Sequence, residues 1–335
     1  MSDPITNILN SSDYIFSNTA HVTINDNAII KFCDDIREKD FEKLRSGYEW
    51  DACDWHYTGN TPLTAQYIFV MDALNFCFWP VQGFEYEQLA TSLRDVLLND
   101  TNAMNANNLK NIDKIKLQSW FPTHELPNID ERVLKLQELG QVLEEDYNGM
   151  ACNMAAAANH SAVALVSLIL DKLPGFRDVA EYKGQQVHFY KRAQILVSDL
   201  WAAYGRLLPS SSSSSSSSSG SSSDSDNHYA CFHDIDRLTM FADYRVPQIL
   251  RHLNILEYDK ETTDKIMNKI ELPAGGEEEL EIRAATIIAV NRIQKALQAK
   301  GIDLLVVEVD WLLWNQGENS LDTMDPHHRT LTTFY

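Results

Sequence analysis

The sequence predicts a mainly α-helical protein with a minor β component. Apolar residues recur at the three-to-four-residue spacing of a buried helix face in four separate segments. Only two short stretches resemble β-hairpins, VTINDNAI from Val22 and EYKGQQVHFY from Glu181, which turn at Asn-Asp-Asn and at Gly. With 335 residues and 44% hydrophobic content, the chain can bury a substantial core. We expect a single helical domain spanning residues 1–335.

The four helical segments follow one another along the chain. In NIDERVLKLQELGQVLEEDY, apolar residues stand at positions 129, 133, 136, 139 and 143. A second apolar face runs from Phe189 to Tyr204, and a third runs from Val246 to Leu256 with Pro247 suited to the first turn. The fourth runs from Ile282 to Leu297 and follows three consecutive glutamates, which suit the positive end of a helix.

Two further segments are strongly apolar. SAVALVSLILDKL, from Ser161, is too short to span a bilayer and predicts a buried core helix. TAQYIFVMDALNFCFW, from Thr64, has an ambiguous period. The N-terminus lacks a basic region followed by an apolar run, and no basic amphipathic segment is present. We therefore expect a protein of the cytoplasm, with the nucleus as the alternative, and no membrane partner.

Net charge and cysteine content indicate which ligands the protein can bind and in which redox compartment it works. The formal net charge of -20 repels polyanions over a Debye length of about 8 Å, so stable nucleic-acid binding is not expected. A small anionic ligand stays possible because a few local cations hold one phosphate. The five cysteines are odd in number and form no CxxC pair, as is typical of reduced thiols inside a cell.

Serine dominates the segment from Pro209 to Asn227. Such a composition cannot bury enough apolar surface to offset the entropy of ordering, so it predicts a disordered insertion at 209–227. Closing a long loop costs only a logarithmically growing entropy, so the insertion can extend from one domain without dividing it.

No short catalytic signature is present: the chain lacks GxGxxG, Walker A, HExxH and GxSxG sequences. Cys231-x-His233 and His327-His328 have no second ligand pair at a structural zinc spacing, so no metal site is expected. Charged residues instead stand among apolar neighbours at Asp72, Lys191-Arg192, Asp243 and Asp310. One such residue is commonly a structural pair, but four together predict a pocket for a polar ligand.

Five motifs resemble the landmarks of one family, the queuosine salvage proteins or queuosine 5'-phosphate N-glycosylase/hydrolases. They are MDALNFCFW, FYKRAQILVSDLW, TMFADYRVPQIL, EIRAATI and VDWLLWN, and the likeness runs from about residue 5 to the final HHRTLTTFY. The resemblance implies an essentially all-helical fold, loosely similar to helical DNA glycosylases. It also implies hydrolysis of queuosine 5'-monophosphate to queuine and ribose 5-phosphate, without a metal or redox cofactor.

The resemblance assigns roles to individual residues. It implies that Asp243 is the catalytic carboxylate and that Lys191 serves the ribose-phosphate end or catalysis. The residues that it places against the base are His56, Phe241, Asp310, Trp311 and Asn315. The family pattern has tyrosine where Trp311 stands and an acid where Asn315 stands. An indole N–H therefore replaces a phenol, and a charge that could hold the cationic amine of queuine is absent.

The chemistry suits these residues. Cleavage of an N-glycosidic bond passes through an oxocarbenium-like transition state, which a carboxylate such as Asp243 stabilises or captures covalently. Its place at a helix start favours the ionised form. The deazaguanine base lacks the ring nitrogen whose protonation helps a purine to leave, so His56, Trp311 or Lys191 must donate while Asp310 orients the ring.

Four cations could hold the phosphate: Lys191, Arg192, Arg245 and Arg283. Arg192 could equally pair with Asp199. Two other functions stay open beside the nucleotide N-glycosidase. One is a glycosylase that acts on polymeric nucleic acid, and the other is a non-catalytic queuine-binding carrier or scaffold.

Overall fold

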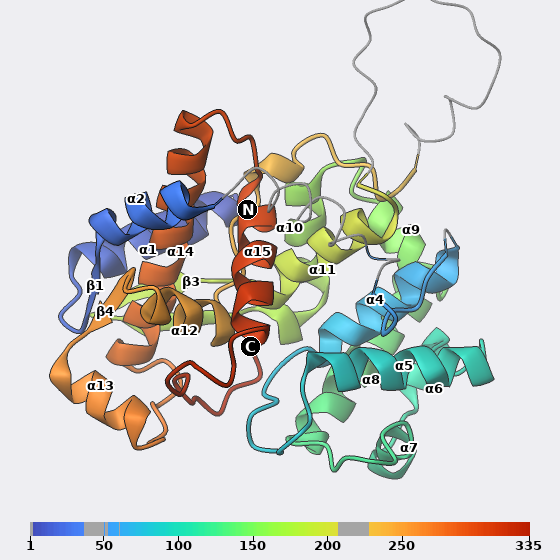
Figure 1. Cartoon of the computed structure of the whole chain (residues 1–335). Coiled ribbons are helices and arrows are strands. Elements are labelled where there is room, and N and C mark those ends of the chain that lie inside the picture. The colour runs from blue at the N-terminus through green and yellow to red at the C-terminus, as the bar shows by residue number, and fades with distance from the viewer. Residues whose placement is uncertain (1–2, 37–49, 51–52, 60, 207–227) are drawn as a thin grey trace, which may run out of the picture. The chain divides into compact units, whose positions relative to one another are not determined.

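The computed structural model describes residues 3–36, 50, 53–59, 61–206 and 228–335 (Figure 1). The chain separates into two compact units, which we describe one at a time. The first unit comprises Met1–Tyr48, Arg177–Gln194 and Leu238–Tyr335, and the second comprises Glu49–Phe176 and Ile195–Arg237. Within the described residues there are fourteen α-helices and two two-stranded sheets, so the predicted mainly α class is confirmed. The serine tract at 209–227 lies outside the described residues, and the single-domain organisation stays a prediction.

The first unit is built around one long helix, α14. Its elements are α1 (Pro4–Ser17), β1 (Val22–Ile24), α2 (Asp26–Asp35), β2 (Val179–Tyr182), β3 (Gln185–His188), α12 (Arg245–His252), β4 (Leu256–Tyr258), α13 (Lys260–Met267), α14 (Glu277–Ala299) and α15 (Val306–Glu318). Helices α1, α2, α12 and α15 all contact α14. Every residue of α14 from 279 to 287 is buried, so this stretch of the helix forms core on all sides.

The two small sheets differ from the sequence prediction in one respect. The predicted hairpin at EYKGQQVHFY is confirmed: β2 pairs antiparallel with β3, and Lys183 (φ 48°) and Gly184 (φ 80°) form a two-residue turn with positive φ at both positions. The predicted hairpin at VTINDNAI is wrong. Strand β1 pairs instead with β4, and the Asn25 side chain accepts the N–H of Ala28 and starts α2.

Helix α12 is shorter than the apolar spacing predicted. It ends at His252, and Leu256 lies in β4. Pro247 stands in the first turn of α12, as expected, where its missing N–H costs no hydrogen bond. Strand β4 therefore follows α12 closely, and this places the pairing partner of β1 immediately after the helix.

The second unit is helical throughout its described part. Its elements are α4 (Pro62–Leu74), α5 (Tyr86–Asn99), α6 (Ala106–Lys110), α7 (Lys114–Ser119), α8 (Ile129–Asp146), α9 (Ala151–Ala156), α10 (Ala162–Lys172), and the 3-10 turns Pro174–Phe176 and Ile235–Arg237. Helix α11 (Lys191–Ala203) begins in the first unit and continues in this one. Every residue of α4 from 64 to 74 is buried, which explains the ambiguous period of this segment.

Helix α10 is the predicted helix after Ser161, and its N-terminus is capped by the Ser161 side chain. Only one face of it, including Leu165 and Ile169, is fully buried. Among the described residues, no helix reaches the length and hydropathy that a membrane crossing needs.

Gly140 allows α8 to lie directly against α6. A Cβ at this position would stand 2.3 Å from the backbone nitrogen of Lys110 and 2.6 Å from the carbonyl oxygen of Ala106. Backbone atoms cannot move aside as a flexible side chain can. We therefore expect Gly140→Ala to lower the free energy of unfolding by about 2 kcal/mol or more, in spite of the higher helix propensity of alanine.

Gly175 offers the matched control for Gly140→Ala. The atoms nearest to its added Cβ all belong to the side chain of Lys135, the first at 2.6 Å, and a lysine side chain can move. Urea unfolding followed by circular dichroism should show a loss of less than about 1 kcal/mol for Gly175→Ala. Equal losses in the two variants would contradict the close packing of α6 on α8.

Candidate active site

Asp243 stands at the start of α12, where its side chain caps the helix. Its Oδ1 accepts the backbone N–H groups of Arg245 at 3.0 Å and Val246 at 2.9 Å. The predicted electropositive donors are therefore present. Burial nevertheless outweighs them and raises the pKa of Asp243, while the charge of Lys191 and the N–H groups of the helix lower it. The helix start thus favours the ionised form of Asp243, as expected, but burial has the larger effect on its pKa.

Asp310 projects from α15 beside the segment that leads to Asp243. It is buried, and its Oδ1 accepts the backbone N–H of Phe241 at 3.0 Å. Burial, followed by the charge of Asp243, raises the pKa of Asp310 well above the ordinary value, whereas the Phe241 N–H and the charge of Lys191 lower it. Two acids that repel each other in this way titrate as a pair. The N–H groups of Arg245 and Val246 stabilise the charge on Asp243, whereas burial beside that charge favours the proton on Asp310.

Lys191 is the first residue of α11 and is buried. Its charge lowers the pKa of both carboxylates, so the ammonium group lies near Asp243 and near Asp310. A charged lysine, an ionised Asp243 and a protonated Asp310 together carry no net charge. This neutrality lowers the free-energy cost of burying the three groups. The structure thus brings together three of the residues that the sequence singled out.

Two of the three arginines that were predicted to hold the phosphate, Arg245 and Arg283, are engaged in protein contacts. All three guanidinium nitrogens of Arg283 are used: Nε donates to the carbonyl oxygen of Ala242 at 3.1 Å, and Nη1 and Nη2 donate to Asp178 at 3.0 and 2.5 Å. Arg245 donates through Nε to Glu318 at 2.6 Å and through Nη1 to Gln248 at 2.6 Å. Both side chains are buried, so these bonds occupy donors that a phosphate would need.

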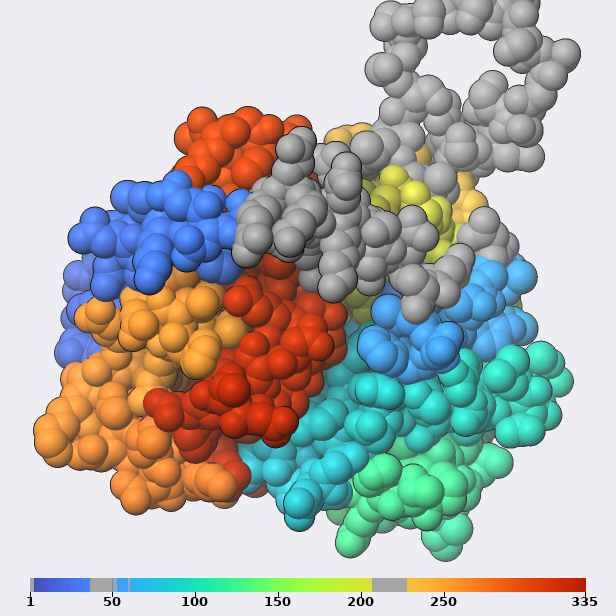
Figure 2. Space-filling model, in the orientation of Figure 1, coloured from blue at the N-terminus to red at the C-terminus, as the bar shows by residue number. Residues whose placement is uncertain are grey.

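The other predicted base contacts of the first unit lie on α15 and before α12. Phe241 is buried, whereas Trp311 and Asn315 are half-buried on α15, part of which reaches the surface in Figure 2. The amide nitrogen of Asn315 donates to the Trp311 carbonyl oxygen one turn earlier, at 2.8 Å. A contact of Asn315 with a ligand would therefore use its Oδ1 or its second amide hydrogen. The roles of all three in binding the base stay predictions.

His56 belongs to the second unit. Its ring stacks on Trp50 at a centroid distance of 3.6 Å, and its Nε2 lies 3.1 Å from the hydroxyl of Tyr86. Burial lowers the pKa of His56 to about 3, so the imidazole is neutral near pH 7. Asp72, the carboxylate noted within the apolar segment, is buried and accepts a hydrogen bond from Asn75 at 3.1 Å. The contact of His56 with the base stays a prediction.

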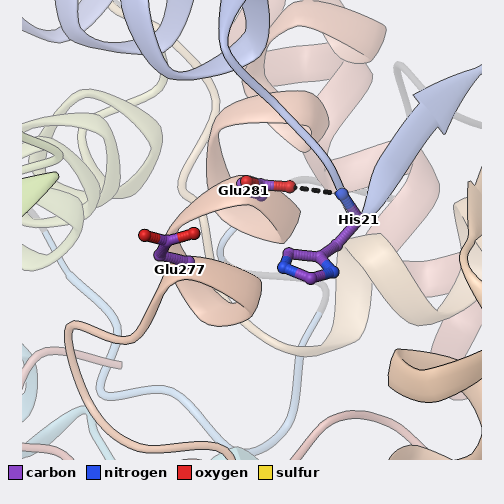
Figure 3. A group of neighbouring side chains, drawn as sticks. All are labelled: His21, Glu277 and Glu281. Atoms are coloured by element: carbon purple, nitrogen blue, oxygen red, sulfur yellow. Dashed lines mark hydrogen bonds between the residues drawn. The ribbon is translucent and has the colours of Figure 1, made fainter. Parts of the chain in front are cut away.

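Three possible metal ligands lie together in the first unit: His21, Glu277 and Glu281, with ligand atoms within 4.8 Å of one another (Figure 3). Protein donors already use the Glu281 carboxylate. These donors are the Thr19 hydroxyl and the N–H groups of Ala20 and His21 on Oε2, and the Tyr182 hydroxyl on Oε1. His21 Nδ1 lies 2.7 Å from Asp259. The group thus anchors the loop before β1 to α14, and we assign no metal to it.

Asp178 is the residue that the sequence did not point to. It is buried, pairs with Arg283, and its Oδ2 also accepts the backbone N–H of Lys191 at 3.3 Å. Asp178 stands outside the five quoted motifs and is flanked by Arg177 and Val179. Only the fold shows that its partner is Arg283, more than a hundred residues along the chain.

A group of two buried acids and one lysine, such as this one, is typical of the active site of an enzyme and not of a scaffold protein. Comparison with known proteins agrees, since the family model described as queuosine salvage protein matches residues 55–211 and 220–335. The chain belongs to the queuosine salvage protein family.

Relatives from distant organisms carry one name, queuosine 5'-phosphate N-glycosylase/hydrolase. The protein of Dictyostelium discoideum is 42% identical over 99% of this chain and 100% of its own length. The protein of Sphaerobacter thermophilus is 41% identical over 84% of each chain. That of Mus musculus is 29% identical over 80% of this chain and 81% of its own.

Proposed function

We propose that this protein hydrolyses the N-glycosidic bond of queuosine 5'-monophosphate and releases queuine and ribose 5-phosphate. The released queuine then becomes available for tRNA modification. The observation that carries the proposal is the cluster of Asp243, Asp310 and Lys191 within a member of the queuosine salvage protein family. A cytoplasmic location is part of the same proposal.

Asp243 is the group that meets the positive charge of the transition state. As the glycosidic bond breaks, the anomeric carbon becomes electron-poor, and an ionised carboxylate beside it stabilises that charge. The N–H groups of Arg245 and Val246 hold Oδ1 of Asp243, and so they orient the carboxylate before substrate binds. Such preorganisation removes the cost of reorienting the group during the reaction.

Asp310 supplies a donor for the leaving base. With its proton retained by burial and by the neighbouring Asp243 charge, its carboxyl O–H can donate to the departing base. This adds a fourth candidate to His56, Trp311 and Lys191. The bond between the base and the anomeric carbon breaks, and its electron pair goes to the base, which takes up a proton. Water adds its oxygen to the anomeric carbon and releases a proton, so that the reaction balances.

The test is direct. Purified protein is incubated with queuosine 5'-monophosphate, and free queuine and ribose 5-phosphate are quantified by chromatography. Stoichiometric release of both products over many turnovers supports the proposal. Binding of queuine without turnover of the nucleotide would establish the carrier function instead. Tight binding of tRNA with a steep dependence on salt would favour action on polymeric nucleic acid, which the net charge of -20 opposes.

The carboxylate pair predicts a bell-shaped dependence of kcat/KM on pH. Activity requires ionised Asp243, so it is lost as the pH falls through the pKa of Asp243, which burial raises above 3.8. Activity also requires protonated Asp310, so it is lost as the pH rises through the pKa of Asp310, which burial and the charge of Asp243 raise well above its ordinary value. Initial rates measured over the pH range check both limbs.

The variant Asp310→Asn separates the two limbs of this profile. Asparagine does not ionise, so the alkaline limb should vanish. The acid limb should stay where it is, because Asp310 is already neutral at the pH where Asp243 titrates. An unchanged profile in Asp310→Asn would exclude the acid pair as its source.

A further inference from the structure

We propose that the buried ion pair between Arg283 and Asp178 is a positioning device that sets Lys191 and Asp243 relative to each other. The inference rests on the proposed function and deepens it, because it gives the catalytic cluster its supporting residues. Arg283 holds the backbone next to Asp243, and Asp178 holds the backbone of Lys191. A single ion pair thereby joins the segments that carry the two groups.

Arg283 fixes the approach to Asp243. Its Nε donates to the carbonyl oxygen of Ala242, the residue directly before Asp243, at 3.1 Å. Arg283 is 2% exposed, and its guanidinium lies over two aromatic rings, at 4.0 Å from the centroid of Phe189 and 4.4 Å from that of Tyr335. Planar contacts and directed hydrogen bonds leave such a group one orientation. The peptide that leads into α12 is therefore held next to the catalytic carboxylate.

Asp178 fixes the first residue of α11. Both of its carboxylate oxygens receive N–H groups of Arg283, and Oδ2 accepts the N–H of Lys191 as well, at 3.3 Å. The carbonyl oxygen of Asp178 accepts the N–H of Phe189 at 3.0 Å and that of Tyr190 at 3.4 Å. One residue thus receives three consecutive backbone amides just where the chain enters α11.

The backbone of Tyr190 shows that this turn is tightly constrained. Its φ of 52° lies in the left-handed region, which is unfavourable for a large side chain. Such a conformation persists only where surrounding contacts determine it, and Asp178 supplies contacts to the residues on both sides as well as to Tyr190 itself. The direction in which Lys191 leaves the turn is set by this arrangement.

Glu279 and Tyr335 complete the surroundings of the ion pair. Glu279 Oε1 lies 3.5 Å from Nη1 of Arg283 and accepts the hydroxyl of Tyr335 at 2.8 Å. Glu279 Oε2 accepts the N–H of Gly275 at 3.0 Å, so this acid is held in place as well. The pair is therefore part of a rigid network, and a small displacement of it would be passed to both segments.

The test uses two variants, Asp178→Asn and Arg283→Lys. The first replaces the aspartate by its neutral amide, and the second replaces the guanidinium by an ammonium group. Lysine keeps the charge of Arg283 but cannot form the two-pronged contact. Because misplacing reacting groups by about 1 Å costs on the order of a hundredfold, kcat should fall about 10- to 100-fold. KM should change less than about threefold, since the affected groups act in the transition state.

The pH profile supplies a readout that loss of stability alone would not move. The charge of Lys191 lowers the pKa of Asp243, so displacing Lys191 should shift the acid limb of kcat/KM to higher pH in both variants. Unshifted limbs together with wild-type kcat would overturn the inference. If Arg283→Lys does not fold, Asp178→Asn carries the test alone, because asparagine keeps the volume of the side chain.

Glu281→Gln is the matched control. Glu281 is on the same helix, is 1% exposed and accepts four hydrogen bonds, none of them from Asp178, Arg283, Lys191 or Asp243. Its variant should keep the wild-type kcat and acid limb, whatever its thermal melting temperature. All rates are measured at a temperature where each variant is folded by circular dichroism. An inactive wild-type protein would refute the proposed function, whereas an active wild type with fully active variants would refute only this inference.

Discussion

Replacing Asp243 with asparagine is expected to reduce kcat by at least about a hundredfold, the usual cost of removing one group that stabilises a transition state. Asparagine retains an oxygen that can accept the N–H groups of Arg245 and Val246, so the start of α12 should persist. In the proposed mechanism, the variant lacks the negative charge beside the anomeric carbon. Release of queuine from queuosine 5'-monophosphate, followed with time, measures the effect.

Asp259→Asn provides the matched comparison for Asp243→Asn. Asp259 also belongs to the first unit and also caps a helix, accepting the N–H of Thr262 at the start of α13 at 2.7 Å. It contributes to neither carboxylate of the candidate site. Asp259→Asn should therefore keep nearly full activity. A loss in Asp259→Asn as large as that in Asp243→Asn would mean that helix capping, and not charge, explains the result.

The largest effect on stability is expected from Arg132→Met in the second unit. Arg132 is fully buried in α8, and its side chain donates to the carbonyl oxygens of four residues, Leu74, Phe76, Cys77 and Pro127. Its guanidinium also lies 4.3 Å from the ring centroid of Phe76. Methionine keeps the apolar stem of the side chain but leaves the carbonyls without these donors. The free energy of unfolding should fall by about 3–5 kcal/mol.

Arg94→Met tests whether burial is the cause. Arg94 lies in α5 of the same unit and pairs with its exposed neighbour Asp95 at 2.7 Å. An exposed pair of this kind contributes less than about 1 kcal/mol. Urea unfolding of both variants gives the comparison. Comparable midpoints for the two would contradict the structural role of Arg132.

Local sequence pattern predicted α8, which buries one face, and also α14, which is buried on all sides over part of its length. The apolar spacing of α8 and the acidic start of α14 are visible in the sequence because each follows from neighbouring residues. In α4 the spacing gave no period, because core surrounds that helix on all sides. The pairing of β1 with β4 joins Val22 to Tyr258, and no local signal could have indicated a partner so distant along the chain.

The candidate site was predictable to the extent that single residues reveal it. Asp243 and Asp310 stood out because a carboxylate among apolar residues is costly unless something compensates. Their mutual influence, and the proton that it assigns to Asp310, depend on distance in space. Arg283 was expected to meet phosphate because an arginine alone does not reveal its partner, and Asp178 was not expected at all. Pairings between distant segments are what the sequence left open.

The packing of the first helices has a practical consequence for shortening this protein. The family match begins at residue 55, yet α1 and α2 both pack on α14, with Ile5, Ile8 and Ile29 almost fully buried. A truncated chain that starts at residue 55 would lack the helices that pack on one side of α14, the helix that carries Arg283. The apolar surface on that side of α14 would then be exposed to water. The limits of the family-model match are thus not the limits of the part of the chain that a folded enzyme needs.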